Sequence, residues 1–87
     1  MKVVVVGGGS WGTAFAALLR DRSHDVTLAC RDPEQVRAIE GTGHNPRYLT
    51  TTDLRGVKPA TVEDAPIADA DLLGIAARER DVVIPVA

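Results

Sequence analysis

The sequence predicts an α/β fold in which helices flank a parallel β-sheet. Three observations support this prediction: an unbroken run of four valines at residues 3–6, a helical apolar pattern directly behind it, and a second strand-then-helix pattern before residue 41. Alternating strands and helices favour a parallel sheet with right-handed crossovers. The length of 87 residues allows one small domain.

The composition excludes several classes of function. A formal net charge of −2 provides no positive field to attract nucleic acid or anionic lipid. The three aromatic residues are too few for a base-stacking platform. Cys30 is the only cysteine, which excludes an internal disulfide and favours a reducing, cytoplasmic compartment. No apolar run reaches the ~18 residues of a membrane span.

The first strand is expected at residues 3–6, because a continuous β-branched run is typical of a strand buried on both faces. A helix is expected from Ser10 to about Arg20. Its large apolar residues recur at helical spacing and should share one face: Trp11, Phe15, Leu18 and Leu19. A polar loop follows, and the second strand is expected at residues 26–30.

A second helix is expected to begin after Asp32, which can cap its first turn, with Pro33 at the first helical position. Gln35 would complete a variant of the capping box by reaching back to the cap residue. Gly41 is expected to end this helix. The first forty residues therefore predict strand, helix, strand, helix.

Beyond residue 41 the pattern is less regular. Residues 41–49 are expected to form a loop. Residues 56–61 favour a short third strand, which Pro59 restricts to an edge or an end of the sheet. Residues 62–70 fit either a turn or a short helix.

The last two apolar segments, residues 71–77 and 81–86, both resemble strands. Only Arg78, Glu79 and Arg80 separate them. Neighbouring parallel strands need a crossover of about a dozen residues, so these segments cannot form such a pair. Either they form a hairpin or one of them is not a strand.

Residues 7–12 read Gly-Gly-Gly-Ser-Trp-Gly and match G-x-G-x-x-G. The match follows a buried strand and opens a helix, which is the setting of a Rossmann-type dinucleotide-binding fold. There Gly7 makes the tight turn, Gly9 lets the backbone approach a pyrophosphate, and Gly12 allows close helix–strand packing. The helix N-terminus would face the phosphates. The register of strand and helix disfavours the alternative, a glycine turn without a ligand.

The end of the second strand usually distinguishes NAD from NADP. An acidic residue there binds the 2′-hydroxyl of NAD, whereas an arginine accommodates the 2′-phosphate of NADP. Arg31 stands at this place and favours tolerance of, or preference for, NADP(H), while Asp32 is expected to serve as a helix cap. A solvated surface role for Arg31 is an equal alternative, so the preference between NAD and NADP stays open.

Four stretches together resemble the N-terminal half of bacterial NAD(P)-dependent glycerol-3-phosphate dehydrogenase: VVVVGGGSWGTAFAALL, HDVTLACRDPEQV, NPRYL and ADADLL. The G-x-G-S-W-G-T-A run is much more specific than the general dinucleotide pattern. The resemblance is good over residues 1–49 and looser to about residue 77. It implies that residues 1–87 are the N-terminal portion of a Rossmann-type dinucleotide-binding domain, without the C-terminal substrate domain.

The resemblance implies an oxidoreductase of phospholipid precursor synthesis, which interconverts dihydroxyacetone phosphate and sn-glycerol 3-phosphate with NAD(P)H. The complete enzyme could be a homodimer. In this family the Ser and Trp of G-S-W-G and the basic residue after the second strand contact the cofactor; they correspond to Ser10, Trp11 and Arg31. Tyr48 of the N-P-x-Y-L loop is carried over as a further contact. Phe15 is expected to pack in the core.

The chain also departs from the family pattern. The family's fourth strand leads into a Val-Pro-Ser segment beside the nicotinamide, where this chain has Ala77 and Arg78, and the next connecting helix is absent. The family's catalytic lysines lie further along, and neither Lys2 nor Lys58 matches them. The chain is therefore expected to contain no catalytic residue and to show no turnover alone. A truncated, non-catalytic nucleotide-binding module is the alternative.

The sequence disfavours two other hypotheses about function. Another two-domain dehydrogenase with a different substrate would share the cofactor half, but the Ser10-Trp11 pair argues against it. One cysteine and two scattered histidines, His24 and His44, do not make a metal site, and none is expected.

Overall fold

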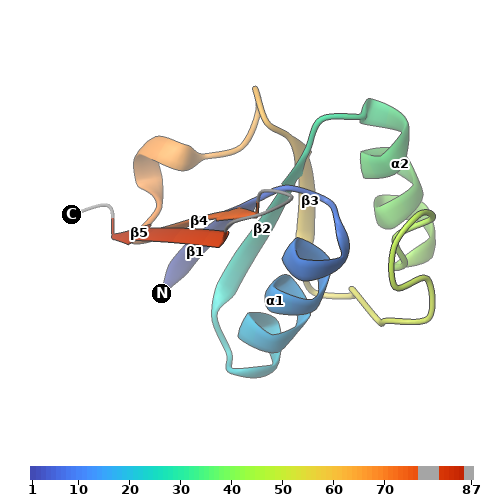
Figure 1. The fold of residues 1–87 in the computed structure, drawn as a ribbon, viewed down its shortest axis with the longest axis horizontal. Coiled ribbons are helices and arrows are strands. Elements are labelled where there is room, and N and C mark those ends of the chain that lie inside the picture. The colour runs from blue at the N-terminus through green and yellow to red at the C-terminus, as the bar shows by residue number, and fades with distance from the viewer. Residues whose placement is uncertain (77–80, 86–87) are drawn as a thin grey trace.

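A computed structural model describes residues 1–76 and 81–85, with residues 72–76 and 81–85 described by their backbone. The elements in chain order are β1 (Lys2–Val6), α1 (Ser10–Asp21), β2 (Asp25–Cys30), α2 (Pro33–Thr42), β3 (Lys58–Thr61), a 3₁₀ turn (Ile67–Asp69), β4 (Leu72–Ala76) and β5 (Asp81–Pro85). The strands form one sheet in the order β3-β2-β1-β4-β5 (Figure 1).

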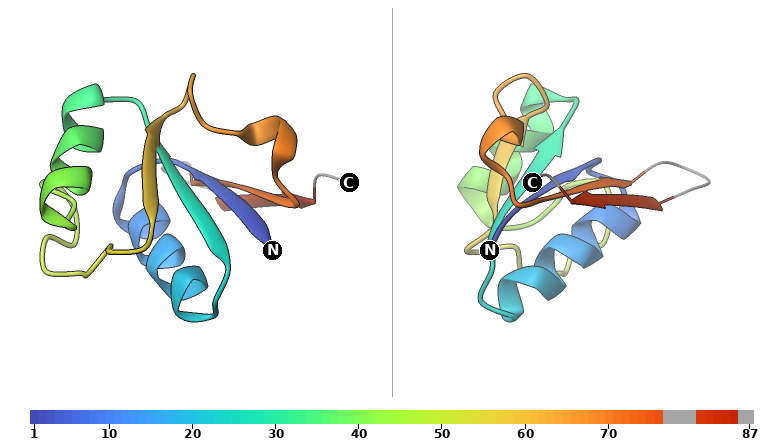
Figure 2. Two further views of the ribbon diagram at one scale, coloured as in Figure 1. Left: turned by 180° about the vertical axis from the view of Figure 1, so that it is seen from behind. Right: turned by 90° about the vertical axis from the view of Figure 1, so that its left-hand side faces the viewer.

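The parallel α/β architecture expected from the sequence is confirmed. β1 pairs in parallel with both β2 and β4, and β2 pairs in parallel with β3. α1 and α2 lie against one face of the sheet, and the segment between β3 and β4 crosses the other (Figure 2). The central valines Val3, Val4 and Val5 are buried, as expected for a strand covered on both faces.

The hydrophobic core is divided between the two faces of the sheet. The two-residue repeat of a strand sends Val26, Leu28 and Cys30 toward the helices and Ala29 to the opposite face. The helix-side cluster is the larger one, while the other face holds a smaller cluster around Val4, Ala29 and Ala70. The helix side therefore contains most of the core.

The large apolar residues of α1 do not mark its buried face. The helix buries small side chains instead: Gly12, Thr13, Ala16 and Ala17. Trp11 and Leu18 are 37% and 50% exposed, whereas Phe15 and Leu19 pack partly against the core. An apolar stripe usually faces the core. Here the helix lies so close to the sheet that only small residues fit along the line of contact, and larger ones are displaced to its flanks.

α2 begins as predicted but ends later. The Asp32 carboxylate accepts a hydrogen bond of 2.9 Å from the Glu34 N–H, and Pro33 occupies the first turn. The prediction that Gly41 ends the helix is wrong: the helix runs to Thr42, and Gly43 caps it with φ of 75°. Glycine suits this position because its φ lies in the left-handed region.

β3 is an edge strand, as Pro59 requires. The Val62 N–H donates to the carbonyl of Cys30 in β2 at 3.1 Å. Because consecutive residues of a strand point their N–H groups to opposite sides, the nitrogen of Pro59 faces the open edge. Its missing N–H therefore costs no hydrogen bond of the sheet.

The two C-terminal segments form a hairpin, one of the alternatives left open by the sequence. β4 and β5 pair antiparallel. Between β3 and β4, the residues that fit a turn or a short helix contain the 3₁₀ turn. Ala77 and Arg78 lie outside the described residues. Among the helices of residues 1–76 and 81–85, none is long and apolar enough to cross a membrane.

Candidate functional site

The glycine turn joins β1 to α1 at the carboxyl edge of the parallel strands. Gly7 has φ of 122°, a backbone conformation that L residues rarely adopt. Its N–H donates to the carbonyl of Ala29 at 2.8 Å, which attaches the turn to β2. The tight turn predicted for Gly7 is confirmed.

The N-terminus of α1 has no side-chain cap. Gly9 is its N-cap and supplies no capping side chain, and the first turn contains no acidic residue. The first helical hydrogen bond runs from the Thr13 N–H to the Gly9 carbonyl at 3.0 Å. The N–H groups of Ser10, Trp11 and Gly12 precede it and have no helical carbonyl to bind. A Cβ built on Gly9 meets nothing within 4 Å, so a bulky anion could approach the backbone there.

The N-terminus of α2 is closed by its own side chains. Asp32 accepts the Glu34 N–H, and Glu34 places a second carboxylate in the first turn. The Asp32 carboxylate thus occupies the place that an anion would take at the backbone of α2, and the Glu34 carboxylate would repel one. Of the two α-helices that the structure describes, α1 is therefore the one suited to bind phosphate.

Gly8 is held by two side chains that the sequence did not single out for this role. Gln35 Nε2 and Asn45 Nδ2 each donate a hydrogen bond of 2.9 Å to its carbonyl. The prediction that Gln35 completes a capping box is wrong, because its side chain binds the glycine turn instead. A Cβ on Gly8 would lie 2.8 Å from Gln35 Nε2 and 2.9 Å from Cys30 Sγ. The middle glycine is thus required by close packing beneath the turn.

Asn45 joins the following loop to the glycine turn. Its side chain is fully buried. Nδ2 also donates to Thr13 Oγ1 at 2.9 Å, and Oδ1 accepts from Gln35 Nε2 at 3.0 Å. Oδ1 further accepts the backbone N–H groups of Arg47 at 2.9 Å and Tyr48 at 3.3 Å. The only sequence signal for this role was the place of Asn45 in the NPRYL stretch.

Four residues predicted to contact the cofactor lie in or after the elements that surround the glycine turn. Ser10 and Trp11 are exposed on the first turn of α1, and Trp11 stacks on Phe15 with ring centroids 4.6 Å apart. Arg31 directly follows β2 and is exposed. Tyr48 is 45% exposed, and its backbone is tied to Asn45.

Gly12 and Phe15 show how α1 meets the sheet. Gly12 is buried, which agrees with the close helix–strand packing predicted for it. Phe15 packs partly against the core, as expected, and its ring also stacks on the Trp11 ring.

Ionisable groups near the turn have shifted pKa values. Hydrogen bonding from the Glu34 N–H, helped by the Arg47 guanidinium, lowers the pKa of the Asp32 carboxyl. Burial raises the pKa of the Cys30 thiol to about 11. At neutral pH Cys30 is therefore a neutral thiol, and its Sγ packs beneath Gly8.

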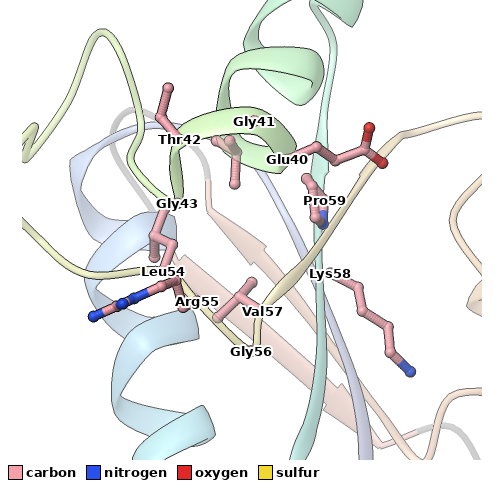
Figure 3. Close-up of a pocket in the computed structure, with 11 residues that line it drawn as sticks. Glu40, Gly41, Thr42, Gly43, Leu54, Arg55, Gly56, Val57, Lys58 and Pro59 are labelled. Carbon is pink, nitrogen blue, oxygen red and sulfur yellow. The ribbon is translucent and has the colours of Figure 1, made fainter.

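A hollow lies away from the glycine turn, among the residues that the structure describes. It has a volume of about 610 Å³ and lies between the end of α2 and the start of β3 (Figure 3). The charged ends of Glu40, Arg55 and Lys58 point away from one another there. Arg55 pairs with Asp53. The described residues contain no buried side-chain polar atom without a partner, so no such atom lines this hollow.

Both lysines lie at the opposite end of the sheet from the glycine turn. Lys2 begins β1, and Lys58 begins β3 and pairs with Asp25 at 2.9 Å. The described residues also contain no group of three or more His, Cys, Asp or Glu side chains that could hold a metal ion.

Comparisons with known proteins identify relatives of this chain. Glycerol-3-phosphate dehydrogenase (NAD(P)+) of Oleidesulfovibrio alaskensis is 48% identical over 69 residues, which are 79% of this chain and 21% of that protein. The enzyme of the same name from Azotobacter vinelandii is 44% identical over 72 residues, 82% of this chain and 21% of that protein. The chain spans about a fifth of the length of these curated relatives.

A solved structure supports the same relationship. The crystal structure of glycerol-3-phosphate dehydrogenase from Coxiella burnetii matches with a TM-score of 0.65 and 30% identity, over 69% of this chain and 19% of that one. The family described as NAD-dependent glycerol-3-phosphate dehydrogenase N-terminus matches residues 2–84. Since this match covers nearly the whole chain, the chain belongs to the family of NAD-dependent glycerol-3-phosphate dehydrogenase N-terminal domains.

Proposed function

We propose that this chain is the NAD(P)-binding portion of a glycerol-3-phosphate dehydrogenase, which reduces dihydroxyacetone phosphate to sn-glycerol 3-phosphate for phospholipid synthesis. The observation that carries the proposal is the uncapped N-terminus of α1 behind the glycine turn, in a chain of this family. Backbone N–H groups and the helix dipole make such a terminus a binding site for the pyrophosphate of a dinucleotide.

The chain's own residues bind and orient the cofactor. The open space at Gly9 admits the pyrophosphate, and the N–H groups of the first turn of α1 donate to it. The exposed side chains around the turn surround the rest of the molecule. The proposed contacts are Gly7, Gly9, Ser10, Trp11, Gly12, Arg31 and Tyr48.

When bound, NADH or NADPH supplies the hydride that reduces the ketone carbon. Neither lysine of the chain is placed to polarise that carbonyl: Lys58 pairs with Asp25 at the start of β3, and Lys2 begins β1. Lys2 is separated from the turn by the length of β1, whose five residues span about 16 Å at ~3.3 Å per residue. Residues outside this chain must hold the substrate, so the chain alone binds cofactor without turnover.

The organisation of the whole enzyme is part of the same proposal. Residues 1–87 form the N-terminal portion of a dinucleotide-binding domain, and a C-terminal helical domain binds the substrate. The complete enzyme is cytoplasmic, could act as a homodimer, and does not bind nucleic acid. The matched residues cover 21% of each of two curated relatives, which supports this division.

A second candidate is a nucleotide-binding module without catalysis. It is favoured by the hairpin of β4 and β5, which stands where the family resemblance implies a helix and a parallel strand. An encoding gene that continues into a helical domain with the catalytic lysines would support the first candidate. A stop codon after residue 87 would support the second.

The experiment that tests the proposal is a thermal-shift titration of the 87-residue chain with NADPH and NADH. A ligand that binds only the folded state at about 100 times its Kd stabilises it by about 2.7 kcal/mol, so a saturable rise in Tm is expected. Mixing the chain with NADPH and dihydroxyacetone phosphate should give no oxidation of NADPH. A cooperative melt that neither dinucleotide shifts would contradict the proposal.

A further inference from the structure

Both carboxylate oxygens of Asp32, which lies just after the carboxyl end of β2, have a partner. One oxygen accepts the Glu34 N–H at 2.9 Å and caps α2. The other oxygen pairs with the Arg47 guanidinium. Arg31, the preceding residue, is exposed beside this pair. Two cations, Arg31 and Arg47, and two anions, Asp32 and the exposed Glu34, therefore lie where a dinucleotide-binding fold distinguishes a ribose 2′-hydroxyl from a 2′-phosphate.

Arg47 is attached to the phosphate-binding turn through a single buried side chain. Its backbone N–H donates to Asn45 Oδ1 at 2.9 Å. Asn45 Nδ2 donates to the Gly8 carbonyl, also at 2.9 Å. Because Asn45 is fully buried, the backbone of Arg47 is fixed relative to the glycine turn. Its side chain is 55% exposed and can meet a ligand bound at that turn.

We propose that Arg47 acts through Asp32 as a specificity-determining residue, and makes this chain select a 2′-phosphorylated dinucleotide over one with a free 2′-hydroxyl. The inference rests on the proposed function. An unpaired Asp32 carboxylate would accept a hydrogen bond from the 2′-hydroxyl and would repel a 2′-phosphate. Arg47 occupies that carboxylate and neutralises it, which leaves the exposed Arg31 without competition from Asp32 for a 2′-phosphate.

The charge state of Asp32 is consistent with this role. The Glu34 N–H and the Arg47 guanidinium both lower its pKa. The carboxylate therefore stays ionised at neutral pH, where it either pairs with Arg47 or is free to act on the ligand.

The test is a calorimetric titration of the 87-residue chain with two ligands that differ only at this position, ADP-ribose and 2′-phospho-ADP-ribose. The quantity compared is the ratio of their Kd values. Arg47→Gln removes the partner of Asp32. Arg22→Gln is the matched control, because Arg22 is exposed at the far end of α1 and its loss changes the net charge equally. Asp32→Asn removes the carboxylate but retains a good N-cap.

The wild-type chain should bind 2′-phospho-ADP-ribose more tightly, and Arg47→Gln should reduce this preference about tenfold, the scale of a hydrogen bond to a charged group. Arg22→Gln should leave it unchanged. The double variant Asp32→Asn/Arg47→Gln should recover the wild-type preference. Circular dichroism melts check that each variant folds.

Three results would overturn the inference while leaving the proposed function intact. These are equal affinity of the wild-type chain for the two ligands, an Arg47→Gln preference equal to that of Arg22→Gln, and a double variant no better than Arg47→Gln. The last result would mean that Arg47 does not act through Asp32. Failure of the wild-type chain to bind either ligand would contradict the proposed function itself.

Discussion

The side-chain amide of Asn45 donates a hydrogen bond of 2.9 Å to the carbonyl of Gly8, 37 residues earlier in the chain. The same amide donates to Thr13 Oγ1 on α1. One buried side chain thus fixes the glycine turn, the first helix and the loop that contains Tyr48 relative to one another. The geometry of the proposed phosphate site depends on this residue.

Replacement of Asn45 should therefore destabilise the chain and weaken dinucleotide binding together. Asn45→Ala leaves Thr13 without this partner and removes one of two donors to Gly8, and a buried polar group left unpaired costs about 1–3 kcal/mol. Urea denaturation should show this loss, and calorimetry should show weaker binding of ADP-ribose. Thr51→Ala, in the exposed part of the same loop, is the control and should change neither. Unchanged stability of Asn45→Ala would contradict the account.

Gly8 should tolerate no side chain. Gly8→Ala places a methyl group within 3.0 Å of Gln35 and Cys30, and such overpacking typically costs about 1–3 kcal/mol. Gly9→Ala is the matched control, because its methyl group meets nothing within 4 Å. Thermal melts should show a large fall in Tm for the first variant and a small one for the second. Equal Tm values for the two variants would contradict the packing described beneath the turn.

Acid should destabilise the chain partly through Asp53. Hydrogen bonds from the Arg55 side chain and backbone N–H hold the pKa of the Asp53 carboxyl far below its usual value. A carboxyl with a depressed folded-state pKa adds stability above its unfolded pKa of about 3.9, and this stability is lost as the pH falls below that value. Asp53→Asn should therefore flatten the fall in stability below about pH 4.

The measurement for Asp53 is urea denaturation at a series of pH values. Asp64→Asn is the control, because Asp64 is also an exposed loop aspartate, and only its backbone N–H takes part in a described hydrogen bond. It should retain the wild-type profile. Parallel profiles for wild type and Asp53→Asn would show that the Asp53–Arg55 pair does not contribute.

Sequence patterns predicted the fold well where residues that are neighbours in the sequence determine the local structure. The valine run, the glycine turn and the Asp32-Pro33 helix start are signals that neighbouring residues create, and each was confirmed. The sequence predicted that α2 ends at Gly41, whereas Gly43 caps it. Both are glycines near the same helix terminus, so the local pattern does not distinguish them. The packing distance between α1 and the sheet is a tertiary property, so the exposure of Trp11 could not be derived.

The candidate site was predictable only in part for the same reason. The G-x-G-x-x-G pattern located the turn, but its supports come from distant residues. Gln35 fits a capping box locally, yet its amide is drawn to Gly8 by an interaction across 27 residues. The sequence of a loop does not reveal whether an asparagine such as Asn45 is exposed to solvent or buried. The cofactor roles of all the predicted contact residues stay predictions.

The central claim is that backbone at Gly9 and the first turn of α1 binds the pyrophosphate. Calorimetric titration with ADP-ribose of the wild-type chain, Gly9→Asp and Gly41→Asp tests it most directly. Both glycines have open space around them and both variants add one negative charge, but only Gly9 faces the proposed phosphate site. The account predicts that Gly9→Asp abolishes binding while Gly41→Asp binds like wild type. Equal binding by all three proteins would contradict it.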